Sequence, residues 1–130
     1  LLFPTMKTTT VLCTFTGFLA FGIQTVTATC YSSGQYFPNR EEARTFVHDA
    51  CYNPGGMFTG NYDPRQLKAM CPRSGNMGIE FVVQNLNTDV GFDLGDDDCY
   101  ERLTNEVFNC EHGGESTISG WFFLARPGTC

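Results

Sequence analysis

Seven cysteines in a chain of 130 residues are the strongest chemical signal in this sequence. Thiols at this density either form disulfides or bind a metal. A zinc site is disfavoured because no CxxC pair occurs and because His48 and His112 belong to no HxxxH pair. We therefore expect disulfide bridges among six of the cysteines, namely Cys30, Cys51, Cys71, Cys99, Cys110 and Cys130.

Other reactive side chains form weaker patterns. His48 falls within a predicted helix and has no nearby serine or cysteine nucleophile that is free of a disulfide role. Asp93 and Glu115 can be imagined as a glycosidase pair, but carboxylates are common in so acidic a chain. The run Asp96, Asp97 and Asp98 lacks the spaced ligands of a calcium loop. We expect no catalysis, no metal site and no cofactor.

The first 28 residues have the pattern of a secretory signal. Lys7 precedes an apolar stretch at residues 11–23, and small residues precede the expected cleavage site. The stretch is short and interrupted by threonines, so membrane insertion is not expected. Alternating Thr and Val also suit a β-strand, which is the alternative interpretation. Removal of residues 1–28 would take away Cys13, leaving an even number of cysteines in a secreted domain of residues 29–130.

The charge of the chain makes some classes of binding partner less favourable than others. All 14 acidic residues follow the predicted signal, and the whole chain has a net charge of −6. An acidic surface repels phosphate backbones, so nucleic acid is not expected as a partner. No N-x-S/T sequon occurs, so the chain is not expected to carry N-linked sugar.

Helical periodicity is found in three segments. Asn39 followed by Glu42 predicts a capping box that opens a helix reaching Cys51. A shorter helix is predicted at residues 63–71, beginning at an Asp-Pro pair and ending before the next proline. A third is predicted at residues 99–109, with the aspartate run at the positive end of its dipole.

The last of these helices restricts the disulfide pairing. Its length separates Cys99 from Cys110 by roughly 16 Å, which is too far for one bridge. Excluding that pair leaves about 12 of the 15 possible pairings. The sequence does not choose among them.

Strand patterns fill most of the remaining chain. Alternation is strongest at residues 77–87, followed by a predicted hairpin partner at 90–94. A last strand is predicted at 117–126. Apolar residues occur on both faces of these strands, so we expect helices to cover both faces of the sheet. The sequence thus predicts one α+β domain crosslinked by disulfides.

Four segments of the chain resemble a family of small secreted, cysteine-rich fungal proteins, the mushroom lectins. They are QNLN at residues 84–87, FDLGDDDC at 92–99, GGESTISGW at 113–121 and the closing ARPGTC. The resemblance covers the region from Cys30 to Cys130. It implies a glycan-binding protein with an α/β/α sandwich on a central antiparallel sheet. It also implies a homodimer in which two sheets join edge to edge around a glycan pocket.

Glycan recognition needs an aromatic face for a sugar ring and fixed polar groups for its hydroxyls. Trp121 is the only tryptophan, and its ordinary explanation is a core aromatic residue under a helix. The other glycan-binding candidates each have an ordinary structural explanation as turn, edge or exposed residues, and they are Asn85, Asn87, Arg126, Tyr52 and Tyr62.

We therefore expect a secreted, extracellular lectin that binds an oligosaccharide or a glycoprotein glycan without catalysis. The alternative is a secreted effector or defence protein that binds a protein target, for which the same small crosslinked scaffold would serve. A hydrolase is the third hypothesis.

Overall fold

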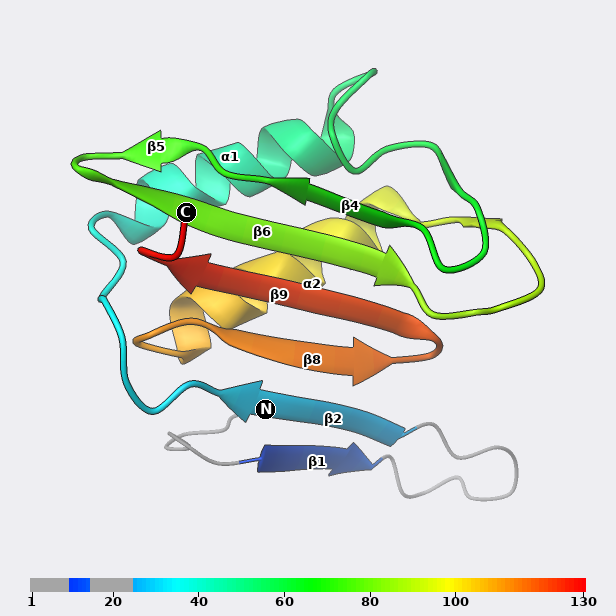
Figure 1. The fold of residues 1–130 in the computed structure, drawn as a ribbon, viewed down its shortest axis with the longest axis horizontal. Coiled ribbons are helices and arrows are strands. Elements are labelled where there is room, and N and C mark those ends of the chain that lie inside the picture. Colours follow the sequence, from blue (N-terminus) through cyan, green and yellow to red (C-terminus); the bar gives the residue numbers. More distant parts are fainter. Residues whose placement is uncertain (1–9, 15–24) are drawn as a thin grey trace.

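The computed structural model describes residues 10–14 and 25–130. These residues form two helices and a mostly antiparallel sheet (Figure 1). The predicted signal segment lies largely outside the described residues, and its cleavage stays a prediction. The elements in chain order are β1 (Thr10–Thr14), β2 (Thr25–Cys30), α1 (Arg40–Tyr52), β3 (Asn61–Tyr62), β4 (Leu67–Met70), β5 (Arg73–Ser74), β6 (Met77–Asn85), β7 (Phe92–Asp93), α2 (Asp96–Asn109), β8 (Gly114–Ile118) and β9 (Trp121–Pro127).

The main sheet runs in the order β1-β2-β8-β9-β6-β4, and β5 also pairs with β6. All of these neighbours are antiparallel. The longest ladder joins β6 to β9, where Phe81 lies opposite Ala125 and Asn85 opposite Trp121. A separate short ladder joins β3 to β7. Because the side chains of a strand alternate between faces, this register fixes which residues of β6 and β9 face the helices.

The two helices form as their sequences predict. The Asn39 side chain accepts a hydrogen bond from the backbone N–H of Glu42 at 3.0 Å, which caps α1. The helix ends at Tyr52, just before the Asn53-Pro54 pair, because a proline disfavours helical backbone geometry at the residue that precedes it. In α2 the three aspartates lie in the first turn, where the positive end of the dipole stabilises them. Its N-cap residue is Gly95, so no aspartate caps this helix.

Both helices lie on the same side of the sheet, behind β6, β9 and β8 in Figure 1. The core lies between them and that face of the sheet. Its buried side chains come from both helices, from β6 and from β9, and include Ala43, Val47, Leu103, Val107, Ile79, Phe81, Val83 and Phe123. In the described residues helices cover one face of the sheet, so the predicted cover of both faces and the α/β/α sandwich are not confirmed.

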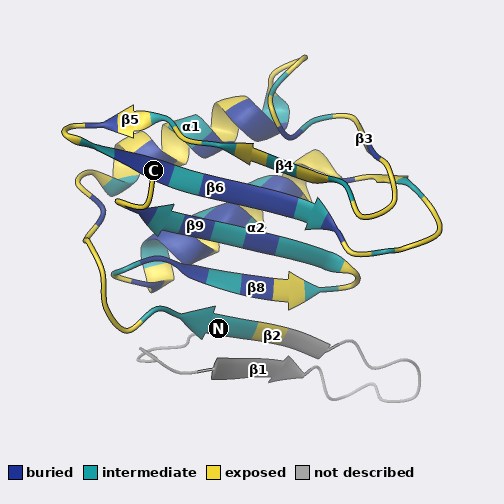
Figure 2. Cartoon of the chain, viewed as in Figure 1, coloured by how far each residue is buried: buried dark blue, intermediate teal, exposed yellow. Residues whose placement is uncertain are grey.

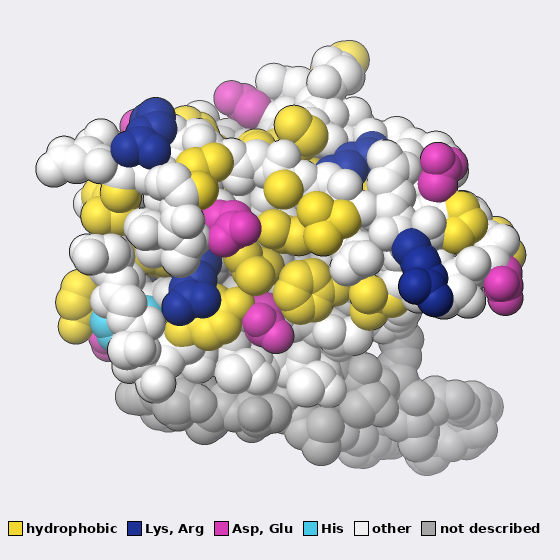
Figure 3. All heavy atoms as spheres, viewed as in Figure 1, with side chains coloured by type: hydrophobic (Ala, Val, Ile, Leu, Met, Phe, Trp, Pro, Cys, Tyr) yellow, Lys and Arg dark blue, Asp and Glu magenta, His cyan; other side chains and the backbone are white. Residues whose placement is uncertain are grey.

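The opposite face of the sheet carries side chains that no helix covers. Leu124 and Phe122 of β9 are half-buried, and Val82 of β6 lies beside them. Figure 2 shows buried and intermediate positions along β6 and β9, and Figure 3 shows hydrophobic side chains gathered over the middle of the sheet on this face. On this face Val82 is nevertheless buried, whereas Phe122 and Leu124 keep part of their surface exposed.

Three disulfides crosslink the fold: Cys30–Cys110, Cys51–Cys99 and Cys71–Cys130. The prediction that Cys99 and Cys110 are not bonded to each other is confirmed, because Cys99 pairs with Cys51 and Cys110 pairs with Cys30. Cys51–Cys99 joins the end of α1 to the start of α2, and Cys71–Cys130 ties the C-terminus to the segment between β4 and β5.

Three element predictions are wrong. Residues 63–71 contain the strand β4 rather than a helix, because residues 67–70 pair with β6 along its edge. The predicted hairpin partner at 90–94 shrinks to β7, which pairs with β3 and not with β6. The last predicted strand is a hairpin of β8 and β9, turned at Ser119 and Gly120 with φ angles of 52° and 82°.

Candidate functional site

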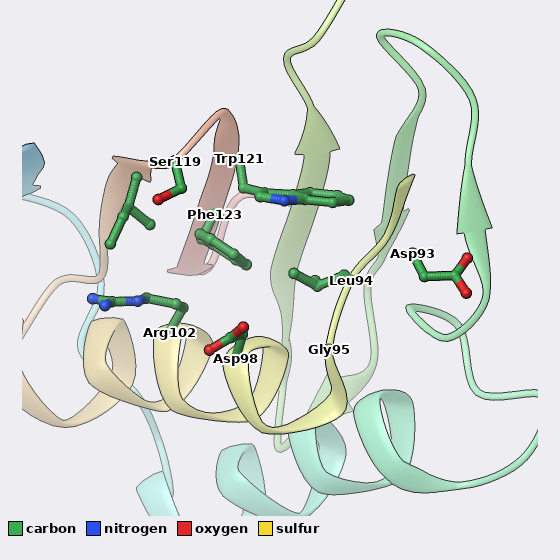
Figure 4. Close-up of a pocket in the computed structure, with 9 residues that line it drawn as sticks. Asp93, Leu94, Gly95, Asp98, Arg102, Ser119, Trp121 and Phe123 are labelled. Atoms are coloured by element: carbon green, nitrogen blue, oxygen red, sulfur yellow. The ribbon is translucent and has the colours of Figure 1, made fainter. Parts of the chain in front are cut away.

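A pocket of about 390 Å³ lies between the first turns of α2 and the helix-facing ends of β8 and β9. The segment that leads from β7 into α2 closes one side of it. The residues that line this pocket, here called the α2–β9 pocket, are Asp93, Leu94, Gly95, Asp98, Arg102, Ile118, Ser119, Trp121 and Phe123 (Figure 4).

Its opposing walls have different chemistry. Trp121 and Phe123 are two positions apart on β9, so their side chains point to the same, helix-facing side of the sheet. Asp98 and Arg102 are one helical turn apart on α2, which places both on the helix face that fronts the pocket. In Figure 4 the indole of Trp121 lies across from these two side chains, whereas the carboxylate of Asp93 points away from them.

The indole of Trp121 is held by the core behind it. Its ring packs edge to face with Tyr62, with 5.0 Å between the ring centroids. Tyr62 is fully buried, and its hydroxyl donates to the Phe58 carbonyl oxygen at 3.1 Å. Burial raises the pKa of the Tyr62 hydroxyl, so this residue stays a neutral hydrogen-bond donor. The orientation of the pocket aromatic is thus set by a residue that does not line the pocket.

A buried carboxyl group lies one turn farther along α2. Glu106 is 4% exposed, and burial raises its pKa to about 7, while the nearby Ser116 hydroxyl and the Arg102 guanidinium act in the opposite direction. Gly114 leaves room for this carboxyl, because a Cβ at that position would lie 3.0 Å from Glu106 Oε1. Glu106 therefore titrates near neutral pH behind the pocket wall that carries Arg102.

The pocket lining combines hydrogen-bond acceptors, donors and an aromatic surface. The carboxylate oxygens of Asp98 are hydrogen-bond acceptors, and the guanidinium of Arg102 only donates hydrogen bonds. A sugar hydroxyl does both, so it can satisfy either group. Trp121 supplies an apolar ring surface next to them.

Of the residues selected from the sequence as glycan contacts, Trp121 lines this pocket. Asn85 is 1% exposed, and its Nδ2 donates to the carbonyl oxygens of Tyr62, Asp63 and Val90 at 3.1–3.3 Å. Its Oδ1 accepts from the Asn87 backbone N–H at 2.9 Å. Because both polar atoms of its side chain bond to backbone groups, Asn85 stabilises the loop after β6 and does not face the pocket.

Asn87 and Tyr62 also have structural positions. Asn87 Oδ1 accepts from the backbone N–H groups of Asp89 and Val90 at 2.9 and 2.8 Å, as a turn-forming asparagine does. Tyr62 was expected in an exposed loop, but it lies in β3 within the core. The expectation of exposure is wrong because pairing with β7 and packing against Trp121 cover this ring.

The two remaining candidates do not line the pocket. Arg126 is on the helix-free face of the sheet, with its guanidinium carbon 4.3 Å from the centre of the Tyr31 ring. The Tyr31 hydroxyl donates to Glu115 Oε1 at 2.6 Å, and burial together with this carboxylate raises the pKa of the hydroxyl. Tyr52 lies on the helical side and donates to Asp97. The candidates chosen from the sequence therefore do not converge on one site.

Asp98 and Arg102 line the pocket but were not among the candidates chosen from the sequence. Their one-turn spacing at the start of a helix is visible in the sequence, but such pairs are common on helix surfaces. Only the packing of α2 against β9 shows that this pair faces Trp121. The imagined glycosidase pair is not assembled, because Asp93 lies at the pocket and Glu115 lies on the other face of the sheet.

Among the described residues, no group of three or more His, Cys, Asp or Glu side chains is arranged to hold a metal ion. No helix in the described part of the chain has the length and apolar character to cross a membrane. No protein-family model matches the sequence, and no curated protein is significantly similar to it.

Proposed function

We propose that this chain is a secreted lectin that binds an oligosaccharide, without catalysis, in the α2–β9 pocket. The observation that carries the proposal is the position of Trp121 across one concave pocket from Asp98 and Arg102. An aromatic surface opposite fixed hydrogen-bonding groups is the combination that sugar recognition requires.

The resemblance to mushroom lectins implies a glycan pocket where two sheets join, whereas the α2–β9 pocket lies within one chain. Support for the α2–β9 pocket comes from the segments that carry the resemblance. Two of the four segments that carry it, residues 92–99 and 113–121, contribute most of the lining. The first contains Asp93, Leu94, Gly95 and Asp98, and the second contains Ile118, Ser119 and Trp121. These segments are distant in the chain, and the fold brings them together at the pocket.

Secretion and dimer formation belong to the proposal. Three disulfides are typical of proteins in oxidising, extracellular environments. The proposed homodimer joins two sheets through their edge strands, whose unpaired backbone groups can extend a sheet. Two pockets in one assembly would raise the apparent affinity for a multivalent glycan. Sedimentation equilibrium of the purified protein tests the dimer separately from glycan binding.

A glycan array followed by titration calorimetry tests the glycan proposal. We expect binding to one family of related structures. Trp121→Ala should weaken it by about tenfold or more, since the stacking surface is lost. Asp98→Asn and Arg102→Gln should each weaken it as well, because each removes a charged hydrogen-bonding partner. A hydrolase would instead release products from the bound glycan, and we expect none.

The matched control is Phe122→Ala, which truncates the neighbouring aromatic residue on the opposite face of β9. It should leave glycan affinity unchanged. Circular dichroism of all variants separates a lost contact from a lost fold. Equal affinity of the Trp121 and Phe122 variants, with both folded, would contradict the assignment of the pocket.

A further inference from the structure

The two helices form a rigid pair whose outer seam faces away from the sheet. They run antiparallel, because the end of α1 is bonded to the start of α2 through Cys51–Cys99. At the other end Arg40 Nε donates to the Val107 carbonyl oxygen at 2.8 Å. Side chains on this seam are therefore held in fixed relative positions.

Three aromatic rings meet on the seam next to the disulfide. The centroid of His48 lies 4.9 Å from that of Tyr52 and 5.8 Å from that of Tyr100, and the two tyrosines are 5.4 Å apart. His48 is exposed, and both tyrosines are half-buried. We call these three residues the aromatic platform. The rings touch one another, so the platform offers an outer surface rather than a cage around a ligand.

Acidic groups surround the platform. The Tyr52 hydroxyl donates to Asp97 Oδ1 at 2.5 Å, and this bond is the main reason that the pKa of Tyr52 is raised to about 12. Asp49 lies 3.8 Å from His48 Nδ1, and Asp96 is also in the first turn of α2. The last turn of α1, which carries Tyr52, has no basic residue. The charge here is complementary to a cation.

Other aromatic rings in the chain already have an internal cation. Arg44 lies over Phe108 on the same helical seam, with its guanidinium carbon 4.5 Å from the ring centre. Arg126 lies over Tyr31 and Lys68 over Tyr62. Over the platform, the described part of the chain places no lysine or arginine. The Arg44–Phe108 pair shows what kind of contact the platform can make with an external group.

We propose that the aromatic platform docks an arginine side chain from a basic segment of another protein. A planar guanidinium stacks on aromatic faces and also pairs with a carboxylate. Tyr52 and Tyr100 supply the faces, and Asp97 supplies the carboxylate. Lysine fits less well, because its ammonium is strongly hydrated and cannot pair in a planar, two-bond arrangement. This docking surface is separate from the α2–β9 pocket and does not depend on glycan binding.

The test is an NMR titration of the isotope-labelled, disulfide-intact protein with a hexa-arginine peptide. Hexalysine and hexaglutamate serve as comparison peptides. We expect chemical-shift changes centred on residues 48, 52, 97 and 100, with weaker binding of hexalysine and none of hexaglutamate. Tyr52→Leu with Tyr100→Leu, which keeps the charge, should weaken hexa-arginine binding by about tenfold. Tyr52→Phe keeps the ring and should retain most of the affinity.

Two controls separate specific docking from general attraction to an acidic protein. Asp97→Asn should weaken binding more than Glu101→Gln, an exposed carboxylate of α2 outside the platform. Equal losses in these two variants, or full binding by the folded double leucine variant, would overturn the proposal. Loss of peptide binding in Trp121→Ala but not in the platform variants would also overturn it.

Discussion

Trp121 and Tyr62 meet edge to face, with their ring planes at 89°. One residue lines the α2–β9 pocket, and the other is fully buried behind it. The core therefore supports the pocket wall, so a substitution at Tyr62 should change the position of Trp121 in the pocket. Because Trp121 is the only tryptophan, its fluorescence reports this relationship directly.

Replacing Tyr62 with leucine should disturb Trp121 without removing any pocket residue. The loss of ring volume should lower the free energy of unfolding by about 2–4 kcal/mol and shift the Trp121 emission. Urea unfolding followed by fluorescence measures both effects. Tyr62→Phe is the control, since it loses only the hydrogen bond to Phe58, worth about 1 kcal/mol, and keeps the ring. An unchanged emission spectrum in the leucine variant would show that Tyr62 does not position Trp121.

Glu106 should make the protein less stable as pH rises towards neutrality. Its pKa is raised from 4.5 to about 7 in the folded state, so the folded protein binds this proton more tightly than the unfolded chain does. The resulting stability is fully present below about pH 4.5, declines up to about pH 7 and is constant above that. A shift of this size corresponds to about 3 kcal/mol.

Glu106→Gln should remove this contribution to the pH profile. The variant should match the wild type at about pH 4 and exceed its stability at about pH 8, as measured by urea denaturation. Glu101→Gln, on the exposed side of the same helix, should show no such crossover. If the wild-type and Glu106→Gln profiles run parallel, the buried carboxyl does not titrate in this range.

Asn85→Ala should loosen the loop that follows β6. Its buried amide bonds three carbonyl groups, and truncation leaves them without these partners. We expect a loss of about 2–4 kcal/mol and faster amide hydrogen exchange at residues 86–91. Gln84→Ala, which changes the preceding and more exposed residue, should cost less than about 1 kcal/mol. Exchange rates that are equal in the two variants would argue against this role.

The three disulfides should open in a set order under mild reduction. Cys71 and Cys130 are exposed, whereas Cys51, Cys99 and Cys110 are buried. A thiolate must reach a sulfur atom to attack it, so Cys71–Cys130 should be reduced first. Alkylation and mass spectrometry at increasing times identify the first free thiols. Early labelling of Cys51 or Cys99 would contradict the burial argument.

Several elements were predictable because local interactions determine them. The Asn39 cap and the apolar stripe up to Cys51 specify α1, and the alternation at residues 77–85 specifies β6. The length of α2 was sufficient to exclude a Cys99–Cys110 bridge. In each case the deciding contacts join residues close in the sequence, where periodicity is informative.

The sequence by itself determined one α+β domain, both helices of its described part, its strongest strand and an even set of six crosslinking cysteines. Tertiary structure alone decided that residues 67–70 are a strand, because pairing with β6 outweighs the local Asp63-Pro64 signal for a helix. It also decided the disulfide partners and the meeting of Asp98 and Arg102 with Trp121. These depend on contacts between distant segments, whose free energy no local pattern contains.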